Sequence, residues 1–327
     1  MAGSGFGTNF RITTWGETHG AGVGVVVDGC PAGLPLERED VQKYLDRRKP
    51  GQSKYTTQRK EGDQVEILSG IFEGRTTGTP ISMVVYNKDQ RSKDYSNIKD
   101  IYRPGHADFT FDMKYGFRDY RGGGRSSGRE TIGRVAAGAV AAKVLKELGI
   151  EIKAYAKAIA GIEVSKDHFD FAEMNNNPFN MPDKEAAKLV QEKADQMIKE
   201  MDSIGGIIEC QITGMPVGIG ETVFDKLDAE LSKAIMSIGS VKGFEIGDGF
   251  EAANLRGSEN NDDFICVDGK VAKETNHSGG VLGGMSDGSA IVFRAAIKPT
   301  PSIAQTQKTV NRDLDNVEIE IHAVMIQ

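Results

Sequence analysis

The sequence has few cysteines and no long hydrophobic run. Only three cysteines occur in 327 residues, and Cys30, Cys210 and Cys266 lack the paired spacing of a metal site or a disulfide framework. This usage is typical of a reducing cytoplasm, and we expect no metal. No apolar stretch reaches the length of a membrane-spanning helix, and residues 1–7 lack the basic and apolar regions of an export signal. We therefore expect a cytoplasmic protein without a membrane segment.

An excess of positive charge is also missing. The net charge of −7 argues against a general binder of nucleic acids or membrane surfaces, because such proteins usually carry a basic footprint. Positive charge is concentrated locally in residues 43–60. This segment has one acidic residue, Asp46, and seven basic residues: Lys43, Arg47, Arg48, Lys49, Lys54, Arg59 and Lys60. This segment indicates a small polyanionic ligand. The alternative is a solvated, charged loop after a helix.

Two common nucleotide-binding motifs do not occur. The chain has no Gly-x-x-x-x-Gly-Lys-Ser/Thr, and no Gly-x-Gly-x-x-Gly that follows a strand and opens a helix. Both absences disfavour a P-loop NTPase and a standard dinucleotide-binding fold.

The stretch of residues 119–130, Asp-Tyr-Arg-Gly-Gly-Gly-Arg-Ser-Ser-Gly-Arg-Glu, leads directly into an apolar run at helical spacing over residues 131–148. Ser127 and Glu130 have the spacing of a capping box, which predicts that the helix begins there. Its free N–H groups, the three glycines and Arg121, Arg125 and Arg129 together predict an anion-binding cradle. The alternative is a flexible glycine loop ahead of an ordinary amphipathic helix.

Helices and strands are expected in alternation along the chain. Apolar periodicity predicts further helices over residues 39–46, 184–201 and 226–237, and strands over residues 24–27, 64–68, 81–86, 206–213 and 289–297. Residues 165–183 are expected to form a surface excursion. The sequence has no internal repeat and no clear linker, so the pattern predicts one α+β domain. The forty glycines indicate either loops that converge on a ligand or ordinary tight turns.

Two of the five histidines stand in loop-like contexts between glycine and charged residues. His19 lies in Trp-Gly-Glu-Thr-His-Gly-Ala, and His106 in Arg-Pro-Gly-His-Ala-Asp. Histidine titrates near neutral pH, so these two are candidates for general acid or base roles. For His168, His277 and His322, contact with solvent or a place in a turn is a sufficient explanation.

Five motifs, spread over almost the whole chain, resemble the chorismate synthase family in their order. They are Gly-Glu-Thr-His-Gly at residues 16–20, Arg-Pro-Gly-His-Ala-Asp at 103–108, Arg-Gly-Gly-Gly-Arg-Ser-Ser-Gly-Arg-Glu-Thr at 121–131, Gly-Gly-Val-Leu-Gly-Gly-Met-Ser at 279–286 and Lys-Pro-Thr-Pro-Ser at 298–302. Each motif alone is weak evidence for this resemblance, but five motifs in the family's order are specific to it.

The resemblance implies a lyase of the shikimate pathway of aromatic amino acid biosynthesis. Its reaction is the anti-1,4-elimination of phosphate from 5-enolpyruvylshikimate 3-phosphate to give chorismate, and it needs reduced FMN (FMNH2) that is not consumed. The implied fold is an α+β sandwich, with a central helical layer between two antiparallel sheets, assembled as a homotetramer. An external reductant would supply the reduced flavin, since no reductase domain is evident, and the family is further associated with NADP.

The resemblance also assigns site residues. His106 would protonate the departing phosphate, and His19 would act as an acid toward the reduced flavin. Arg48, Arg103 and Arg129 would bind the phosphate and carboxylates of the substrate. The FMN site would contain Arg125, Ser126, Ser127, Gly239, Ser240, Gly283, Lys298, Pro299, Thr300, Pro301 and Ser302.

The chain departs from the family pattern at several positions. Thr18 replaces a serine, Lys54 an arginine, and Gly239-Ser240 an Asn-Ala pair. After residue 321 the family continues with Gly-Arg-His-Asp-Pro, whereas this chain reads His-Ala-Val-Met-Ile-Gln. Loss of one nucleotide from suitable codons for the family segment gives Ala-Val-Met-Ile, so we interpret residues 1–327 as a single chorismate synthase domain, truncated or frame-shifted after about residue 322.

This ending predicts weakened FMN binding and turnover, because the family segment carries an arginine and an aspartate for the flavin. Two functions therefore compete with the enzyme. One is a catalytically impaired form that binds flavin or phosphate ligands. The other is a nucleic-acid module built on the Arg-Gly tract, which the acidic net charge opposes.

Overall fold

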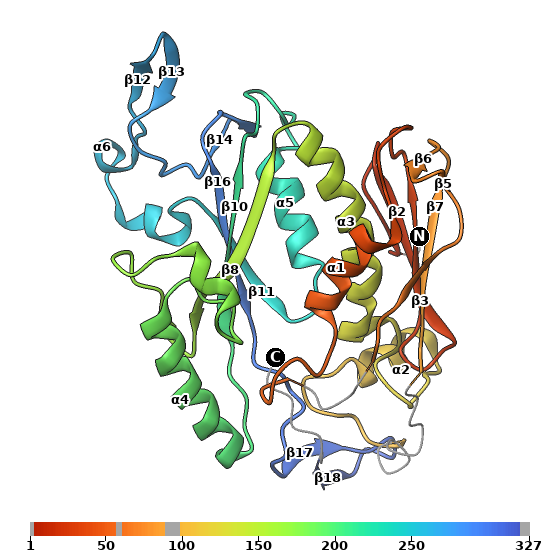
Figure 1. The fold of residues 1–327 in the computed structure, drawn as a ribbon. Coiled ribbons are helices and arrows are strands. Elements are labelled where there is room, and N and C mark those ends of the chain that lie inside the picture. Colours follow the sequence, from red (N-terminus) through yellow and green to blue (C-terminus); the bar gives the residue numbers. More distant parts are fainter. Residues whose placement is uncertain (1–2, 57–60, 89–98, 321–327) are drawn as a thin grey trace. The chain divides into compact units, whose positions relative to one another are not determined.

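The computed structural model describes residues 3–56, 61–88 and 99–320. Contacts within the chain divide it into two compact units. Unit 1 contains Met1–Val144, Met197–Ser203 and Thr300–Gln327, and unit 2 contains Leu145–Gln196 and Ile204–Pro299. Figure 1 draws both units and labels many of their helices and strands.

Unit 1 is built on a five-stranded antiparallel sheet in the order β1-β2-β3-β7-β4. Its strands are β1 (Gly5–Phe6), β2 (Arg11–Gly16), β3 (Gly22–Asp28), β7 (Ile81–Tyr86) and β4 (Val65–Ile67). The central strands β3 and β7 are rich in valine, which suits a pleated, buried surface. Smaller antiparallel pairs are β5 (Ile71–Phe72) with β6 (Arg75–Thr76), and β17 (Gln307–Val310) with β18 (Asn316–Ile319).

Helices α1 (Arg38–Arg48) and α3 (Thr131–Glu147) cover this sheet (Figure 1). Val41 and Leu45 of α1 and Ile132 and Val140 of α3 belong to one buried apolar cluster with the valines of β3. Two 3-10 turns, η2 (Gly124–Ser126) and η3 (Gly128–Glu130), precede α3, and the short helix α2 (Asp108–Tyr115) ends at Gly116. The sheet and helices thus fix the ends of three loops that carry predicted site residues.

Unit 2 contains a second antiparallel sheet, in the order β11-β16-β10-β8-β9. Its strands are β11 (Val241–Ile246), β16 (Ile291–Ile297), β10 (Gly206–Thr213), β8 (Glu151–Ile159) and β9 (Ile162–Glu163). Helix α5 (Leu227–Met236) packs on it through one apolar cluster, and α4 (Lys184–Glu200) lies over another that contains Ala156, Val164 and Met181. This unit also contains two hairpins, β12 (Phe264–Val267) with β13 (Lys270–Lys273) and β14 (Val281–Leu282) with β15 (Met285–Ser286). Its shorter helical elements are η4 (Phe171–Asn175), η5 (Gly249–Asn254) and α6 (Gly257–Asn260).

The secondary structure confirms the expected α+β class. All four predicted helices and all five predicted strands are present, with ends that differ by a few residues. The capping box is wrong. Ser127 accepts a hydrogen bond from Arg129 N at 3.3 Å, but the Glu130 carboxylate turns to Thr14 Oγ1 and Arg134, and α3 begins only at Thr131.

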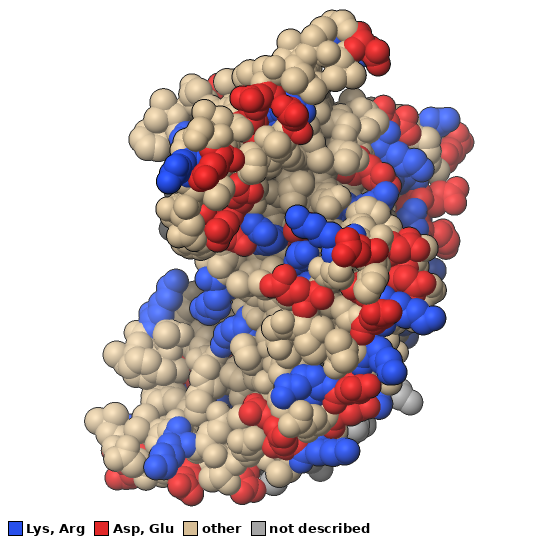
Figure 2. Space-filling model, turned by 90° about the vertical axis from the view of Figure 1, so that its left-hand side faces the viewer, with Lys and Arg blue, Asp and Glu red and all other residues tan. Residues whose placement is uncertain are grey.

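The three cysteines and the charged side chains are distributed as follows. Cys30, Cys210 and Cys266 are all free thiols, and the last is exposed. In the face drawn in Figure 2, acidic and basic side chains are interspersed. Within the described ranges, no helix is both long enough and apolar enough to cross a membrane.

Candidate active site

The loop between β2 and β3 carries Thr18 and His19. It begins at Gly16, whose positive φ of 85° suits glycine, and Asn87 Nδ2 holds it by donating to the carbonyls of Glu17 at 2.9 Å and Gly20 at 2.8 Å. Thr18 is buried, and its Oγ1 has no hydrogen-bond partner among the described residues. A buried hydroxyl of this kind is suited to a water or a ligand.

Gly122 lies directly against the imidazole of His19. A Cβ atom at this position would come within 2.5 Å of His19 Cδ2 and 2.7 Å of Nε2. The first glycine of the Arg-Gly-Gly-Gly tract therefore leaves the space that the histidine ring occupies. This contact connects the loop after β2 to the tract before α3.

Two buried carboxylates face two of the predicted substrate-binding arginines. Arg48 Nη1 donates to Asp63 Oδ2 at 2.8 Å, and Arg129 Nη1 lies 2.9 Å from Asp63 Oδ1. Glu61 Oε2 lies 3.8 Å from Arg129 Nη2. Arg129 Nε donates to Asn87 Oδ1 at 2.7 Å, so the residue that holds the His19 loop also orients this guanidinium. The structure therefore brings Arg48 and Arg129 together on Asp63.

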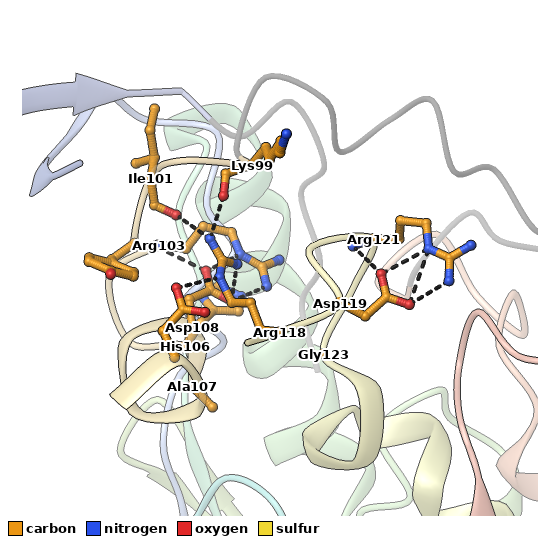
Figure 3. A network of polar contacts seen from close by, with 12 residues as sticks. Lys99, Ile101, Arg103, His106, Ala107, Asp108, Arg118, Asp119, Arg121 and Gly123 are labelled. Atoms are coloured by element: carbon orange, nitrogen blue, oxygen red, sulfur yellow. Dashed lines mark hydrogen bonds and ion pairs between the residues drawn. The ribbon is translucent and has the colours of Figure 1, made fainter. Parts of the chain in front are cut away.

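The third predicted substrate arginine, Arg103, forms a bidentate ion pair with Asp108. Its Nε and Nη2 donate to the two carboxylate oxygens, each at 2.8 Å (Figure 3). Arg118 approaches the same carboxylate at 3.3 Å and also donates to Asp112. Burial opposes ionisation of Asp108, but the hydrogen bonds and charges of the arginines outweigh it, so its pKa lies below the usual value.

Each ring nitrogen of His106 has a hydrogen-bond partner. Nδ1 lies 2.9 Å from the carbonyl oxygen of Pro104, which can only accept, so Nδ1 carries a proton. Nε2 lies 3.0 Å from Ser302 Oγ, a residue that the sequence placed in the FMN site. Nε2 of His106 therefore faces the C-terminal Lys-Pro-Thr-Pro-Ser motif. Thr300 of this motif is buried, and its carbonyl accepts from Ser203 Oγ at 2.7 Å.

Two arginines of the glycine-arginine tract contact acceptors within unit 1. Arg121 is neutralised by Asp119, with Nε–Oδ1 and Nη2–Oδ2 distances of 2.8 and 2.6 Å (Figure 3). The hydrogen bond from Arg121 is also the largest cause that lowers the pKa of Asp119. Arg125 donates to Thr14 Oγ1 and to the carbonyls of Thr14 and Gly16, and therefore anchors the tract to β2.

The two serines of the tract make local contacts. Ser126 Oγ donates to Gly123 O at 2.6 Å, and Ser127 caps the η3 turn. Only Arg129 of the three arginines keeps a buried nitrogen, Nη2, with no hydrogen-bond partner within the described ranges.

The basic segment of residues 43–60 is mixed in character. Lys43 and Lys49 pair with carboxylates of their own helix at 3.5 and 3.1 Å, and Lys54 lies over the Tyr55 ring. Among the described basic residues of this segment, Arg48 is the one that contacts the buried Asp63. Arg59 and Lys60 lie outside the described residues, as does the C-terminal segment after residue 320.

The remaining predicted FMN residues belong to unit 2. Ser240 has a left-handed backbone with φ 71°, and its carbonyl accepts from Lys298 N at 2.9 Å, so the end of β16 lies beside the start of β11. Pro299 packs against Gly205. Gly239 is open: a Cβ atom there would meet no described atom within 4 Å. Gly283 lies in the β14–β15 hairpin, with φ 61°.

Sequence reasoning missed the partners of the arginines. Glu61, Asp63, Asn87 and Arg118 were not selected, and Asp108 was named only as part of a motif. Their common signal is burial of a charged or amide side chain, which a single sequence does not show. The Glu-Gly-Asp run at residues 61–63, after the basic segment, is the one local hint.

Comparisons with known proteins agree with one another. The family model described as chorismate synthase matches residues 10–324. Chorismate synthase of Lachnospira eligens is 68% identical over 321 residues, covering 98% of this chain and 88% of the relative. That of Agathobacter rectalis is 65% identical over the same length and with the same coverage.

A solved structure described as "Crystal Structure of Chorismate Synthase" has a TM-score of 0.76 and 33% sequence identity, covering 89% of this chain and 85% of that one. This likeness confirms the fold class that the motifs implied.

Proposed function

This chain belongs to the chorismate synthase family, and we propose that it catalyses the anti-1,4-elimination of phosphate from 5-enolpyruvylshikimate 3-phosphate to give chorismate. Membership makes it an enzyme of a lyase family. The observation that carries the proposal is that both candidate acids, His19 and His106, lie on loops tied to buried arginines of the same unit. Cations and a nearby acid are what the departure of phosphate requires.

His106 is suited to protonate the leaving group. Because Nδ1 is held by the Pro104 carbonyl, the proton exchanged with the ligand resides on Nε2. The contact with Ser302 Oγ holds this nitrogen in one direction, toward the predicted flavin motif. Protonated His106 would then donate from Nε2 to the departing phosphate, while Arg48, Arg103 and Arg129 hold the anionic groups of the substrate.

The residues present fit reduced FMN. In unit 2, open space at Gly239 allows close approach to the main chain. In unit 1, the buried Thr18 hydroxyl beside His19 has no hydrogen-bond partner among the described residues, and a polar ligand would supply one. When bound, reduced FMN supplies an electron that assists cleavage of an unactivated C–H bond. His19 would hold a proton toward it. The residues that would bind FMN are Arg125, Ser126, Ser127, Gly239, Ser240, Gly283 and Lys298, Pro299, Thr300, Pro301 and Ser302.

Assembly and supply of the cofactor are part of the same proposal. The protein would act as a single functional domain in the cytoplasm, as a homotetramer, and would receive reduced flavin from an external reductant linked to NADP. Family membership supports each of these statements. Size measurement by light scattering tests the assembly.

The experiment that tests the reaction is an anaerobic assay with chemically reduced FMN. We expect release of phosphate and formation of chorismate in equal amounts from 5-enolpyruvylshikimate 3-phosphate, and none when FMN stays oxidised. The variant His106→Ala should lose about 10²–10⁴-fold in kcat, the usual contribution of a general acid. Ligand binding without phosphate release from the wild-type protein would instead indicate a binding protein, and would overturn the proposal.

A further inference from the structure

Asp63 is the most completely enclosed acidic residue of the site. Its side chain has an exposed fraction of 0%, although no catalytic or binding role falls to it in the proposed reaction. Its backbone is left-handed, with φ 42°, a conformation that non-glycine residues adopt only where their surroundings hold them. Gln42 Nε2 of α1 donates to the Asp63 carbonyl at 3.1 Å and fixes this turn. The fold thus maintains an unfavourable backbone in order to place one carboxylate.

That carboxylate bridges two arginines from different elements. Oδ2 accepts from Nη1 of Arg48, at the end of α1, and Oδ1 lies beside Nη1 of Arg129, in the η3 turn. Each guanidinium has a second anchor. Arg48 Nε donates to Thr131 Oγ1 at 3.2 Å, and Arg129 Nε donates to Asn87 Oδ1. Both forks are therefore fixed in direction before any ligand arrives.

One donor is left over in this arrangement. Arg129 Nη2 is buried, has no hydrogen-bond partner within the described part of the chain, and lies 3.8 Å from Glu61 Oε2, beyond hydrogen-bond reach. Buried donors in folded proteins almost always have an acceptor. The formal charges of the two arginines, Glu61 and Asp63 cancel. Attraction of an anion to this cluster therefore depends on directed donors more than on net charge.

We propose that Asp63 is a positioning residue for anion recognition: it bridges Arg48 and Arg129 and directs Arg129 Nη2 toward an oxyanion of the substrate. The proposal rests on the function proposed above and adds a residue that does not touch the substrate. It makes the buried carboxylate responsible for the geometry of the arginines. Preorganised donors bind a ligand without the cost of ordering flexible side chains.

The variant Asp63→Asn separates a positioning role from simple electrostatics, because the two predict opposite changes in the affinity for the anionic substrate. Removing a negative charge beside two arginines makes the cluster more positive, which by itself tightens the binding of an anion. Loss of the bridge releases the guanidinium forks and weakens directed hydrogen bonds. We expect the dissociation constant for 5-enolpyruvylshikimate 3-phosphate to rise by about tenfold to a hundredfold, the range for one charge-assisted hydrogen bond.

Binding is measured by calorimetry with 5-enolpyruvylshikimate 3-phosphate and oxidised FMN, so that no turnover is needed. Asp183→Asn is the matched control. This carboxylate is also buried, but its hydrogen bonds from the described residues come from the backbone N–H groups of Ser165, Glu185 and Ala186 in unit 2. The control should bind like the wild type. Unchanged or tighter binding by a folded Asp63→Asn protein would overturn the proposal.

A double-mutant cycle tests the bridge itself. In an Arg129→Lys background the Arg48 fork remains, but the Arg129 Nη2 donor that Asp63 directs toward the substrate is gone, so Asp63→Asn should have a smaller effect than in the wild type. Equal effects in both backgrounds would contradict the proposal. If Asp63→Asn does not fold, as shown by circular dichroism, Asn87→Ala releases the same guanidinium at Nε and should also weaken binding. Unchanged binding by that variant would then overturn the proposal.

The two proposals fail in different ways. A wild-type protein that binds the shikimate phosphate but releases no phosphate contradicts the proposed reaction and leaves the calorimetric comparison valid. A wild-type protein that turns over, with an Asp63→Asn variant of unaltered affinity, contradicts the positioning role alone.

Discussion

The variant Asp108→Asn should strongly destabilise unit 1. Asp108 is buried at the start of α2, where its two oxygens accept both arms of the Arg103 fork and lie near Arg118. Asparagine has nearly the same shape, so the packing of α2 is retained. The change removes the negative charge and leaves the Arg103 guanidinium buried without its carboxylate.

The magnitude follows from this geometry. At about 4 Å and an effective dielectric constant of about 20, a unit charge pair attracts by about 4 kcal/mol, and most of this is offset by the desolvation of both groups. Removing one partner does not recover the desolvation of the other. Measured losses for a broken buried pair are about 3–5 kcal/mol. Because asparagine keeps one acceptor for Arg103, and Arg118 keeps Asp112, we expect about 3 kcal/mol.

Equilibrium unfolding in urea at pH 7 measures this loss. Asp119→Asn is the matched control, since it removes the same charge from an arginine pair whose side chains are 46% and 32% exposed. Exposed pairs contribute less than about 1 kcal/mol, so the control should unfold nearly like the wild type. A loss below about 1 kcal/mol for Asp108→Asn, or equal losses for both variants, would refute the reasoning.

The pH dependence gives a second reading of the same contact. The folded-state pKa of Asp108 is lowered, so its stabilising contribution is present above the unfolded pKa, about 3.9, and is lost as the pH falls through the folded value. The difference in stability between wild type and Asp108→Asn should therefore stay constant from pH 8 to pH 5 and shrink below about pH 4.

Three further changes have defined expectations. Gly122→Ala should displace the His19 ring and lower kcat in the anaerobic assay, whereas Gly138→Ala, at an open helical position, should leave kcat unchanged and stabilise the protein by up to about 1 kcal/mol. Lys273→Met should lower the free energy of unfolding in urea by about 3–5 kcal/mol, because it leaves the buried carboxylates of Asp262 and Asp287, 3.0 and 2.7 Å from Nζ, without their cation. A loss of stability below about 1 kcal/mol would contradict this expectation. Burial, and then the charge of Glu209, raises the pKa of Cys210 to about 11. Iodoacetamide at pH 8 should therefore alkylate the exposed Cys266 of β12 before Cys210, as measured by mass spectrometry of peptides. Equal rates of alkylation at the two cysteines would contradict this expectation.

Helices with strong apolar periodicity were predictable from local sequence. The run that forms α3 buries Ile132, Ala136 and Val140 on one face. Their spacing of four residues is visible in the sequence of this segment alone. Its start was predicted less well. Glu130 has the spacing of a capping partner, but Thr14 of β2 and Arg134 compete for its carboxylate, and only the folded chain brings Thr14 near.

The strand β8 was not predicted, because its sequence, Glu-Ile-Lys-Ala-Tyr-Ala-Lys-Ala-Ile, is rich in residues with low strand propensity. Its antiparallel pairing with β10 runs from Ile159 opposite Gly206 to Glu151 opposite Thr213, with one register shift between Ile207 and Ile208, and this pairing determines its conformation. Tertiary pairing here overrides the intrinsic preference of alanine and lysine for helices.

The candidate site shows the same contrast between local sequence signals and tertiary contacts. The motifs identified His19, His106 and the arginines, because each motif is contiguous and its residue types are chemically distinctive. They did not identify which charges are free. Arg121 and Arg125 were expected to face a ligand, and in the structure Asp119 accepts from Arg121 and the backbone of β2 accepts from Arg125. A count of charges along the sequence does not show which protein groups a guanidinium contacts.

The sequence by itself determined the family, the helical and strand repeats, and the residue types of the candidate chemistry, because these depend on neighbours within a few positions. Tertiary structure alone decided the pairing: Asp63 with Arg129, and His106 with Ser302, are separated by long stretches of chain. Burial makes each such pairing decisive, since a buried charge or ring nitrogen must find a partner, and the fold determines which one lies within reach.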